Sequence, residues 1–279
     1  MRSMENIPGN TALKTTLLVP LALVVILLSL FSSCSSRSRE EALFQKSMTA
    51  LDQGLDGAAV EYLTQLLVRY PEGALVEEAL YQRGIIYQVY QSRYQDAVSD
   101  YRELLDRFPG GKRSMESRLA LAEIFGQKLD NCQLAIAQYQ KLISDFDSVV
   151  DDDKYQFRIA ACYFELLNFD QSLLEYRSLI EQYPASPLVE NAYFQIASVL
   201  QTQGRVKEAE KAWLTFMARY PDGKLITNAR FGLASTLEDE EKLKEALDLY
   251  QDLFDEYDNK EAISWRIERV KDRLKARKR

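Results

Sequence analysis

Residues 205–223 read RVKEAEKAWLTFMARYPDG, and they contain the clearest copy of the unit from which the fold is built. A small residue, Ala209, is followed after four, seven and eleven positions by Trp213, Phe216 and Tyr220. Residues at this spacing lie on one stripe of an amphipathic helix. Pro221 cannot continue a helix and Gly223 follows it, so the stretch predicts a helix that ends at about residue 220.

The same pattern occurs six times along the chain. An aromatic residue followed by Pro or Asp recurs at intervals of 38, 38, 37, 37 and 37, at Tyr70, Phe108, Phe146, Tyr183, Tyr220 and Tyr257. A small residue stands eleven positions before each one, at Ala59, Ala97, Ala135, Ser172, Ala209 and Ala246. The large residue four positions after it is Leu63, Tyr101, Tyr139, Tyr176, Trp213 or Tyr250.

A second helix is predicted before each of these. Its own small residue lies twelve or thirteen positions earlier, at Ser47, Gly84, Ala122, Ala160, Ala197 and Ala234. Turn residues such as Gly54 and Gly204 separate the two helices in some copies. Small residues at matching positions allow two antiparallel helices to cross closely, so each copy predicts a helix-turn-helix unit.

This arrangement resembles the tetratricopeptide repeat, in which a small residue of each helix packs against large residues and a Pro closes the unit. The resemblance implies an all-α fold, a right-handed superhelical solenoid of about six repeats. We expect the repeats over residues 40–262, at about 40–76, 77–114, 115–153, 154–190, 191–227 and 228–262.

Residues 263–279 are predicted to form a capping helix that covers the last repeat, because Ile263, Ile267, Val270 and Leu274 share one stripe. The other face is basic, with a net charge of +6 from Arg266 to Arg279. Two interpretations stay open. The basic residues contact an acidic partner or an anionic envelope surface, or they are solvated and favourable to the helix dipole.

Composition excludes several functions. The 279 residues include no His, which rules out Ser-His-Asp and Cys-His nucleophiles and HExxH zinc sites. The net charge of −7 argues against binding to nucleic acid. Without a phosphate loop or a nucleophile motif, we expect no enzyme, no catalytic residue, no cofactor and no small-molecule substrate.

The acidic runs are candidate metal sites, and two cysteines are candidates for a disulfide bond. One acidic cluster consists of Asp145, Asp147 and Asp151 to Asp153. It lacks the spacing of a Ca²⁺ loop, so a solvated linker is favoured over a metal site. The acidic run from Glu238 to Glu241 is also interpreted as solvated. Cys132 and Cys162 fall on neighbouring predicted helices. Two buried thiols are favoured over a disulfide.

Residues 1–33 have the pattern of a secretory signal, with Arg2 and Lys14 before an apolar run from Leu17 to Phe31. Ser32 and Ser33 precede Cys34, which resembles the lipobox of bacterial lipoproteins. The resemblance implies that Cys34 is acylated, that residues 34–39 form a polar tether, and that the protein is anchored by lipid to the periplasmic face of the outer membrane. An uncleaved signal anchor is the alternative.

Protein binding is the predicted function. The first helices of such repeats line the concave face of the solenoid, and a recurring aromatic three residues before the small residue is expected to line a peptide groove, at Phe44, Tyr81, Phe157, Phe194 and Phe231. The alternative is that these rings pack between repeats.

Lipobox, tether and Tyr-Pro repeats together resemble the BamD family of outer-membrane assembly lipoproteins, which implies partners in the β-barrel assembly machinery. The repeats also resemble the CpoB (YbgF) family of cell-division coordinators. That resemblance implies Tol-Pal or peptidoglycan-linked partners instead.

Overall fold

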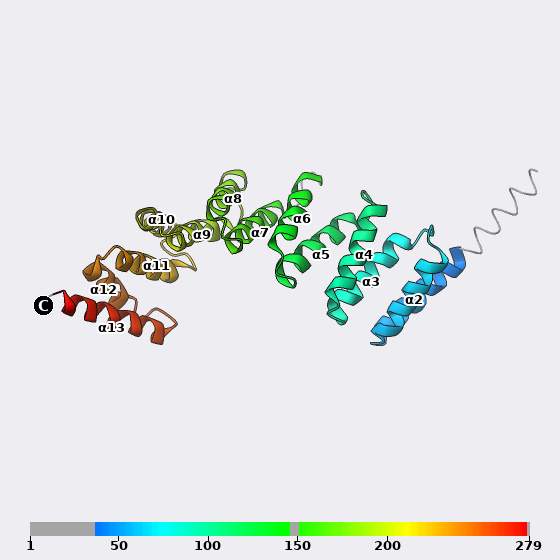
Figure 1. Ribbon diagram of the computed structural model, residues 1–279, viewed down its shortest axis with the longest axis horizontal. Helices are drawn as coiled ribbons and strands as arrows, with labels where there is room; N and C mark the ends of the chain where they lie inside the picture. Colours follow the sequence, from blue (N-terminus) through cyan, green and yellow to red (C-terminus); the bar gives the residue numbers. More distant parts are fainter. Residues whose placement is uncertain (1–36, 146–150, 278–279) are drawn as a thin grey trace, which may run out of the picture. The chain divides into compact units, whose positions relative to one another are not determined.

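The computed structural model describes residues 37–145 and 151–277, and the described ranges contain helices and no strand (Figure 1). This confirms the predicted all-helical class. The helices are the segment 37–52, α2 (Asp56–Arg69), α3 (Val76–Ile85) with the π-helix η1 (Ile86–Tyr90), α4 (Tyr94–Arg107), α5 (Ser114–Gln127), α6 (Cys132–Asp145), α7 (Asp152–Glu165), α8 (Phe169–Gln182), α9 (Val189–Thr202), α10 (Val206–Arg219), α11 (Ile226–Asp239), α12 (Leu243–Asp252) and α13 (Lys260–Ala276).

The chain divides into two compact units, residues 1–117 and 118–279, and the division falls inside α5. In each unit, helices that follow one another along the chain pack against one another, as in a tetratricopeptide solenoid. Each repeat has a first and a second helix. For example, α7 and α8 are the first and second helix of repeat 4, and α9 and α10 those of repeat 5.

The small residues lie at the centre of each helix pair. All six small residues of the second helices are fully buried, as are Ser47, Ala122, Ala160, Ala197 and Ala234 of the first helices. At Gly84 an added Cβ would lie 2.6 Å from the ring of Tyr101, so only glycine fits that crossing. The predicted packing frame is therefore correct.

Serine replaces alanine at two of these crossings and adds a hydrogen bond. Ser47 Oγ donates to the carbonyl of Ala59, and Ser172 Oγ donates to the carbonyl of Ala160, both at 2.9 Å. Each bond joins the first and second helix of one repeat. The buried hydroxyl group is thus satisfied without disturbing the close approach.

The turn between first and second helix contains one residue with positive φ in every repeat. Two of these are glycines, Gly54 and Gly204, but the other four carry side chains. The six positions, five residues before the small residue of each second helix, are Gly54, Ser92, Asp130, Leu167, Gly204 and Glu241. A left-handed backbone costs a residue with a side chain about 1–2 kcal/mol. The turn is therefore set by the geometry of the repeat and not by glycine.

Repeats are joined by acidic side chains near the start of the first helices. Glu40 accepts a hydrogen bond from the backbone N–H of Leu75 at 2.6 Å, and Glu77 accepts one from that of Arg113 at 2.7 Å. Glu190 likewise accepts a bond from the N–H of Leu225, at 3.4 Å. Each carboxylate thus lies at the start of the first helix of the next repeat, where negative charge is favourable.

After three of the four Tyr-Pro or Phe-Pro pairs, the glycine two positions beyond the proline makes room for this contact. A Cβ at Gly73, Gly111 or Gly223 would lie 2.2–2.5 Å from a carboxylate oxygen of Glu40, Glu77 or Glu190. Glycine therefore does more than end the preceding helix. It lets the carboxylate of one repeat approach the backbone of the next.

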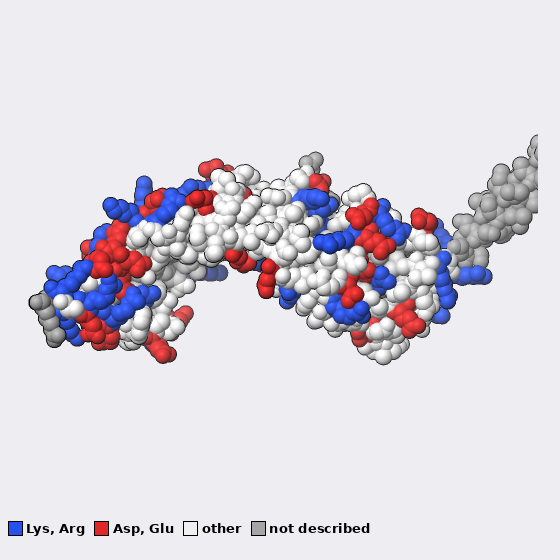
Figure 2. All heavy atoms as spheres, in the orientation of Figure 1, with Lys and Arg blue, Asp and Glu red and all other residues white. Residues whose placement is uncertain are grey.

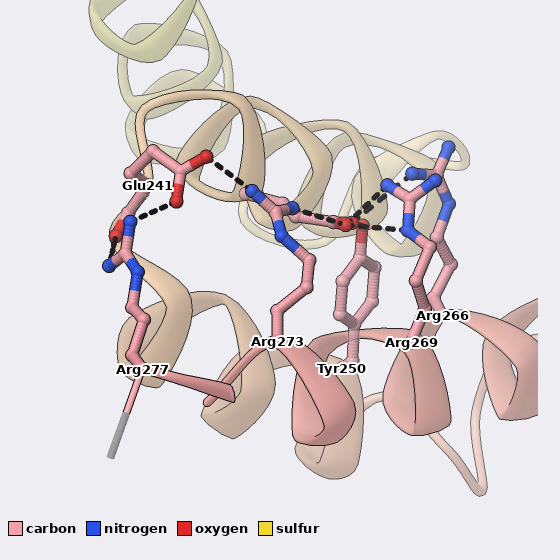
Figure 3. Close-up of polar contacts among 7 residues, drawn as sticks. Glu241, Tyr250, Arg266, Arg269, Arg273 and Arg277 are labelled. Carbon is pink, nitrogen blue, oxygen red and sulfur yellow. Dashed lines mark hydrogen bonds and ion pairs between the residues drawn. The ribbon is translucent and has the colours of Figure 1, made fainter. Parts of the chain in front are cut away.

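The last helix, α13, is held to α11 by a buried carboxylate. Glu238 is fully buried and accepts hydrogen bonds from Nη1 of Arg266 at 3.2 Å, Nε of Arg269 at 2.7 Å and Nη1 of Arg273 at 2.9 Å (Figure 3). The hydroxyl of Tyr250 donates to the same carboxylate at 3.4 Å. The interpretation of Glu238 as solvated is wrong, because α13 covers it with three guanidinium groups.

On the basic face of α13, the basic residues that the structure describes, from Arg266 to Arg277, also form ion pairs within the protein. Arg273 and Arg277 both form ion pairs with Glu241. Four of its arginines thus bind α11 or the turn after it, and Lys271 and Lys275 pair with Glu268 and Asp272. Neither binding to an acidic partner or surface nor solvation at the helix end predicts that these arginines hold α13 to α11.

Candidate protein-binding groove

One groove opens on the side formed by first helices, between α5 and α7 and over α6. We call it the first-helix groove. It has a volume of about 450 Å³. Its lining residues are Leu119 and Glu123 of α5, Tyr139 of α6, Lys154, Tyr155, Phe157 and Arg158 of α7, Asp151 before α7 and Leu188 before α9. Of the five aromatics that were predicted to line a groove, Phe157 is the one found here.

Aromatic rings form the floor of the first-helix groove. The rings of Tyr139 and Tyr155 stack, with centroids 5.8 Å apart and planes inclined by 25°. Phe157 is half-buried and packs edge-on against Tyr176, with centroids 5.2 Å apart. Rings held in this way offer a rigid apolar surface, which suits the side chains of a bound peptide.

Charged side chains stand at the rim of the groove. Arg158 and Glu123 are both exposed, and neither forms an ion pair with another residue in the described part of the chain. Burial raises the pKa of Tyr139 to about 12, and its hydroxyl stays protonated at neutral pH. The groove thus combines an apolar floor with one unpaired cation and one unpaired carboxylate.

The other predicted aromatics pack inside their own repeats. The rings of Tyr81, Phe194 and Phe231 lie 6.2, 5.0 and 5.4 Å from the second-helix aromatic of the same repeat. Phe44 packs against an apolar cluster formed by residues of repeats 1 and 2. All four are half-buried. The apolar clusters that they pack against also contain residues of the neighbouring repeat or of α13, so packing between repeats stays an open alternative and their role in a groove stays a prediction.

Both Cys132 and Cys162 are free thiols and both are buried. Cys132 Sγ donates to a carboxylate oxygen of Glu165 at 2.9 Å. Burial, reinforced by hydrogen bonds with Cys162 and Glu165, raises the pKa of Cys132 well above the usual value. A thiol that resists ionisation is a poor nucleophile, which fits a structural role.

The acidic run before α7 forms local contacts. Asp151 pairs with Lys154 at 2.5 Å, and Asp153 accepts a hydrogen bond from Ser186 Oγ. Residues 37–145 and 151–277 hold no group of His, Cys, Asp and Glu side chains suited to a metal ion. Asp147 lies outside these ranges.

The predicted signal and lipidation site, residues 1–33 and Cys34, lie outside the described residues. Among the described helices, none combines the length and the apolar character needed to cross a membrane.

Sequence profiles agree with the helix pairs. Profiles described as tetratricopeptide repeat match residues 78–111, 155–186 and 194–260, which correspond to helices of repeats 2, 4, 5 and 6. The chain contains tetratricopeptide repeats. Tetratricopeptide repeats are protein-interaction units, so the matched repeats imply a protein-interaction scaffold.

Solved structures of other tetratricopeptide repeat proteins have the same fold. The C-terminal part of a repeat protein from Cytophaga hutchinsonii matches with a TM-score of 0.60 at 12% identity, over 82% of this chain and 87% of that one. A tetratricopeptide repeat protein from Parabacteroides merdae gives 0.50 at 16% identity, over 83% and 98%. PilW, a type IV pilus biogenesis factor, gives 0.50 at 15%, over 83% and 97%. No curated protein matches in sequence.

The other residues that line the first-helix groove could not be identified from the sequence pattern. Leu119 stands in repeat 3 where the other repeats carry the recurring aromatic, and no sequence pattern points to Leu119, Arg158 or Glu123 as groove residues. One signal was available. Repeat 3 is the copy in which the recurring aromatic is replaced by leucine, a smaller side chain.

Proposed function

We propose that the protein is a lipid-anchored scaffold of the cell envelope that binds a segment of a partner protein in the first-helix groove. The observation that carries the proposal is the pairing of an aromatic floor with unpaired Arg158 and Glu123 at the rim. An extended or helical segment would place apolar side chains on Tyr155 and Phe157 and opposite charges beside the two rim residues.

The cellular part of the proposal rests on the N-terminal sequence. Acylation at Cys34 anchors the protein to the outer membrane on the periplasmic side, since two or more acyl chains hold a protein firmly at a bilayer. The short distance from Cys34 to the first repeat favours a role like that of the BamD family, in the assembly of outer-membrane β-barrel proteins. A Tol-Pal or peptidoglycan-linked role, like that of the CpoB family, is the second candidate.

Partner capture tests the binding part. The full chain, extracted in mild detergent after crosslinking in cells, is expected to retain a specific envelope protein, and Arg158→Glu is expected to reduce its yield at least fivefold. Lys244→Glu makes the same change at an exposed position of α12 and serves as the control. Equal yields from the two variants would refute binding in this groove.

The identity of the captured protein separates the two cellular roles. Recovery of a large outer-membrane β-barrel protein supports the assembly role. Recovery of Tol-Pal components, or sedimentation with peptidoglycan, supports the second role. A Cys34→Ala variant that still fractionates with the membrane would refute lipid as the anchor.

A further inference from the structure

A second groove lies between the second helices α8 and α10, with α9 as its floor. We call it the second-helix groove. Its volume is about 530 Å³, within the usual range for ligand pockets. The apolar part of its lining is formed by Ile180, Ile196, Leu200 and Ala212. The first-helix groove shares none of its lining residues, so the two are separate sites.

One small residue distinguishes repeat 5 at this place. Ala212 stands three positions after the small residue of α10. The other five repeats carry a larger side chain at the equivalent position, namely Tyr62, Asp100, Gln138, Glu175 and Leu249. Repeat 5 therefore lacks, at this one position, the side-chain volume that the other copies have.

Equivalent side chains in other repeats occupy the corresponding space. Glu175 in repeat 4 accepts hydrogen bonds from Gln156 of α7 and from Gln171. Asp100 in repeat 2 binds Arg83 through two hydrogen bonds, at 2.8 and 2.6 Å. Leu249 in repeat 6 packs against the apolar cluster of the C-terminal repeats. In repeat 5 the space over Ile196 and Leu200 stays open.

The rim of the second-helix groove determines the charge of an occupant. Arg177 of α8 and Lys211 of α10 are exposed, and neither forms an ion pair within 4 Å among the described residues. Glu208, also at the rim, is neutralised by Arg205 at 2.5 Å. Glu181 adds one carboxylate without such a partner. With Glu208 paired, the two cations Arg177 and Lys211 stand on opposite walls against the single unpaired carboxylate of Glu181, and this excess of positive charge favours an acidic occupant.

We propose that the second-helix groove binds an acidic amphipathic helix of a partner protein. A furrow between two helices accepts a third helix by interdigitation of side chains. One leucine or phenylalanine of the partner fills the space above Ala212, and acidic residues on either side of it pair with Arg177 and Lys211. This second binding site is separate from the first-helix groove. A negative result at one site therefore leaves the proposal for the other site unaffected.

A designed peptide tests the proposal directly. The probe is a fluorescent 20-residue helix with leucines on one face and glutamates beside them, and its counterpart has lysine in place of each glutamate. Fluorescence anisotropy with the full chain is expected to show at least tenfold tighter binding of the acidic probe. The variant Arg177→Glu/Lys211→Glu is expected to abolish or reverse this preference.

Filling the groove provides the decisive variant. Ala212→Leu introduces the side chain that repeat 6 carries at Leu249, and it is expected to weaken binding of the acidic probe at least tenfold without lowering the melting temperature. Ala218→Leu, at an exposed position of α10 outside the groove, is the matched control and is expected to bind as the wild type does. Absence of probe binding, equal binding of both probes, or equal binding by the Ala212→Leu variant would each overturn the proposal.

Discussion

The middle of the C-terminal unit and its end are built from the same type of repeat, but the middle has open grooves and the end is closed by ion pairs. Around α7 to α10 two grooves are open, and Figure 2 shows a largely uncharged surface over α7 and the neighbouring parts of α6 and α8. Around α11 to α13 the surface is densely charged, and arginines of α13 bind Glu238 and Glu241. The packing frame is common to both regions. Single side chains therefore decide whether a repeat offers a binding surface or closes the array.

The largest effect is expected from breaking the closed end. Glu238→Ala leaves three guanidinium groups without this carboxylate. It should lower the free energy of unfolding by about 2–3 kcal/mol, at or just below the range of about 3–5 kcal/mol for broken buried pairs, because the arginines are partly exposed. Denaturant unfolding measures the loss. Glu245→Ala, at an exposed site of α12, should change stability by less than about 0.5 kcal/mol. Equal effects of the two variants would show that α13 is not held by Glu238.

Alkaline pH is expected to act on both regions through buried tyrosines. Burial raises the pKa of Tyr139, in the open region, to about 12, and it also raises the pKa of Tyr250 in the closed end. A phenol with a raised pKa stabilises the fold fully below its ordinary pKa of about 10, and this contribution is lost as pH rises through the folded value.

For Tyr139 the free energy of unfolding should fall by about 2–3 kcal/mol by about pH 12 and above, because each unit of pKa difference corresponds to about 1.4 kcal/mol. Unfolding measured from pH 9 to 12 checks this. The Tyr139→Phe variant should lose less stability over that range than the wild type, whereas Tyr90→Phe, at an exposed position, should not differ from it. Parallel curves for wild type and Tyr139→Phe would contradict the assignment.

The smallest change in stability is expected from glycine substitutions at the left-handed turn position, which can be compared between the two regions. Leu167, before α8, has φ of 58° and is 72% exposed, so nothing offsets its left-handed backbone. Leu167→Gly should stabilise the protein by about 0.5–1 kcal/mol. Glu241, before α12, has φ of 62° but pairs with Arg273 and Arg277. Glu241→Gly should therefore give no gain. A similar gain from both would mean that the ion pairs contribute nothing.

The packing inside a repeat could be predicted from the sequence, because it recurs in six copies and follows the period of a helix. The crossings at residues such as Ala160 and Ser172 were located in this way. Contacts between repeats could not be located by periodicity alone. Glu238 belongs to a run of four acidic residues, and only its position under α13 makes it differ from its neighbours.

The site was predicted in part. Phe157 lines the first-helix groove and packs on Tyr176, and the same pattern at Phe194 and Phe231 marks rings that pack on Trp213 and Tyr250. The binding role of all three stays a prediction. The second-helix groove depends on the absence of a large side chain at Ala212. A pattern built on shared residues does not reveal such a position. Comparison of the six copies with one another does.

Photo-crosslinking in cells tests the central claim, that the first-helix groove is where the scaffold binds its partner. A photoreactive amino acid at position 158, in that groove, is compared with one at position 244, on exposed α12. We expect one specific envelope protein to crosslink from position 158 and not from position 244. Equal crosslinking of the same protein from both positions, or crosslinking from position 244 alone, would contradict binding in the first-helix groove.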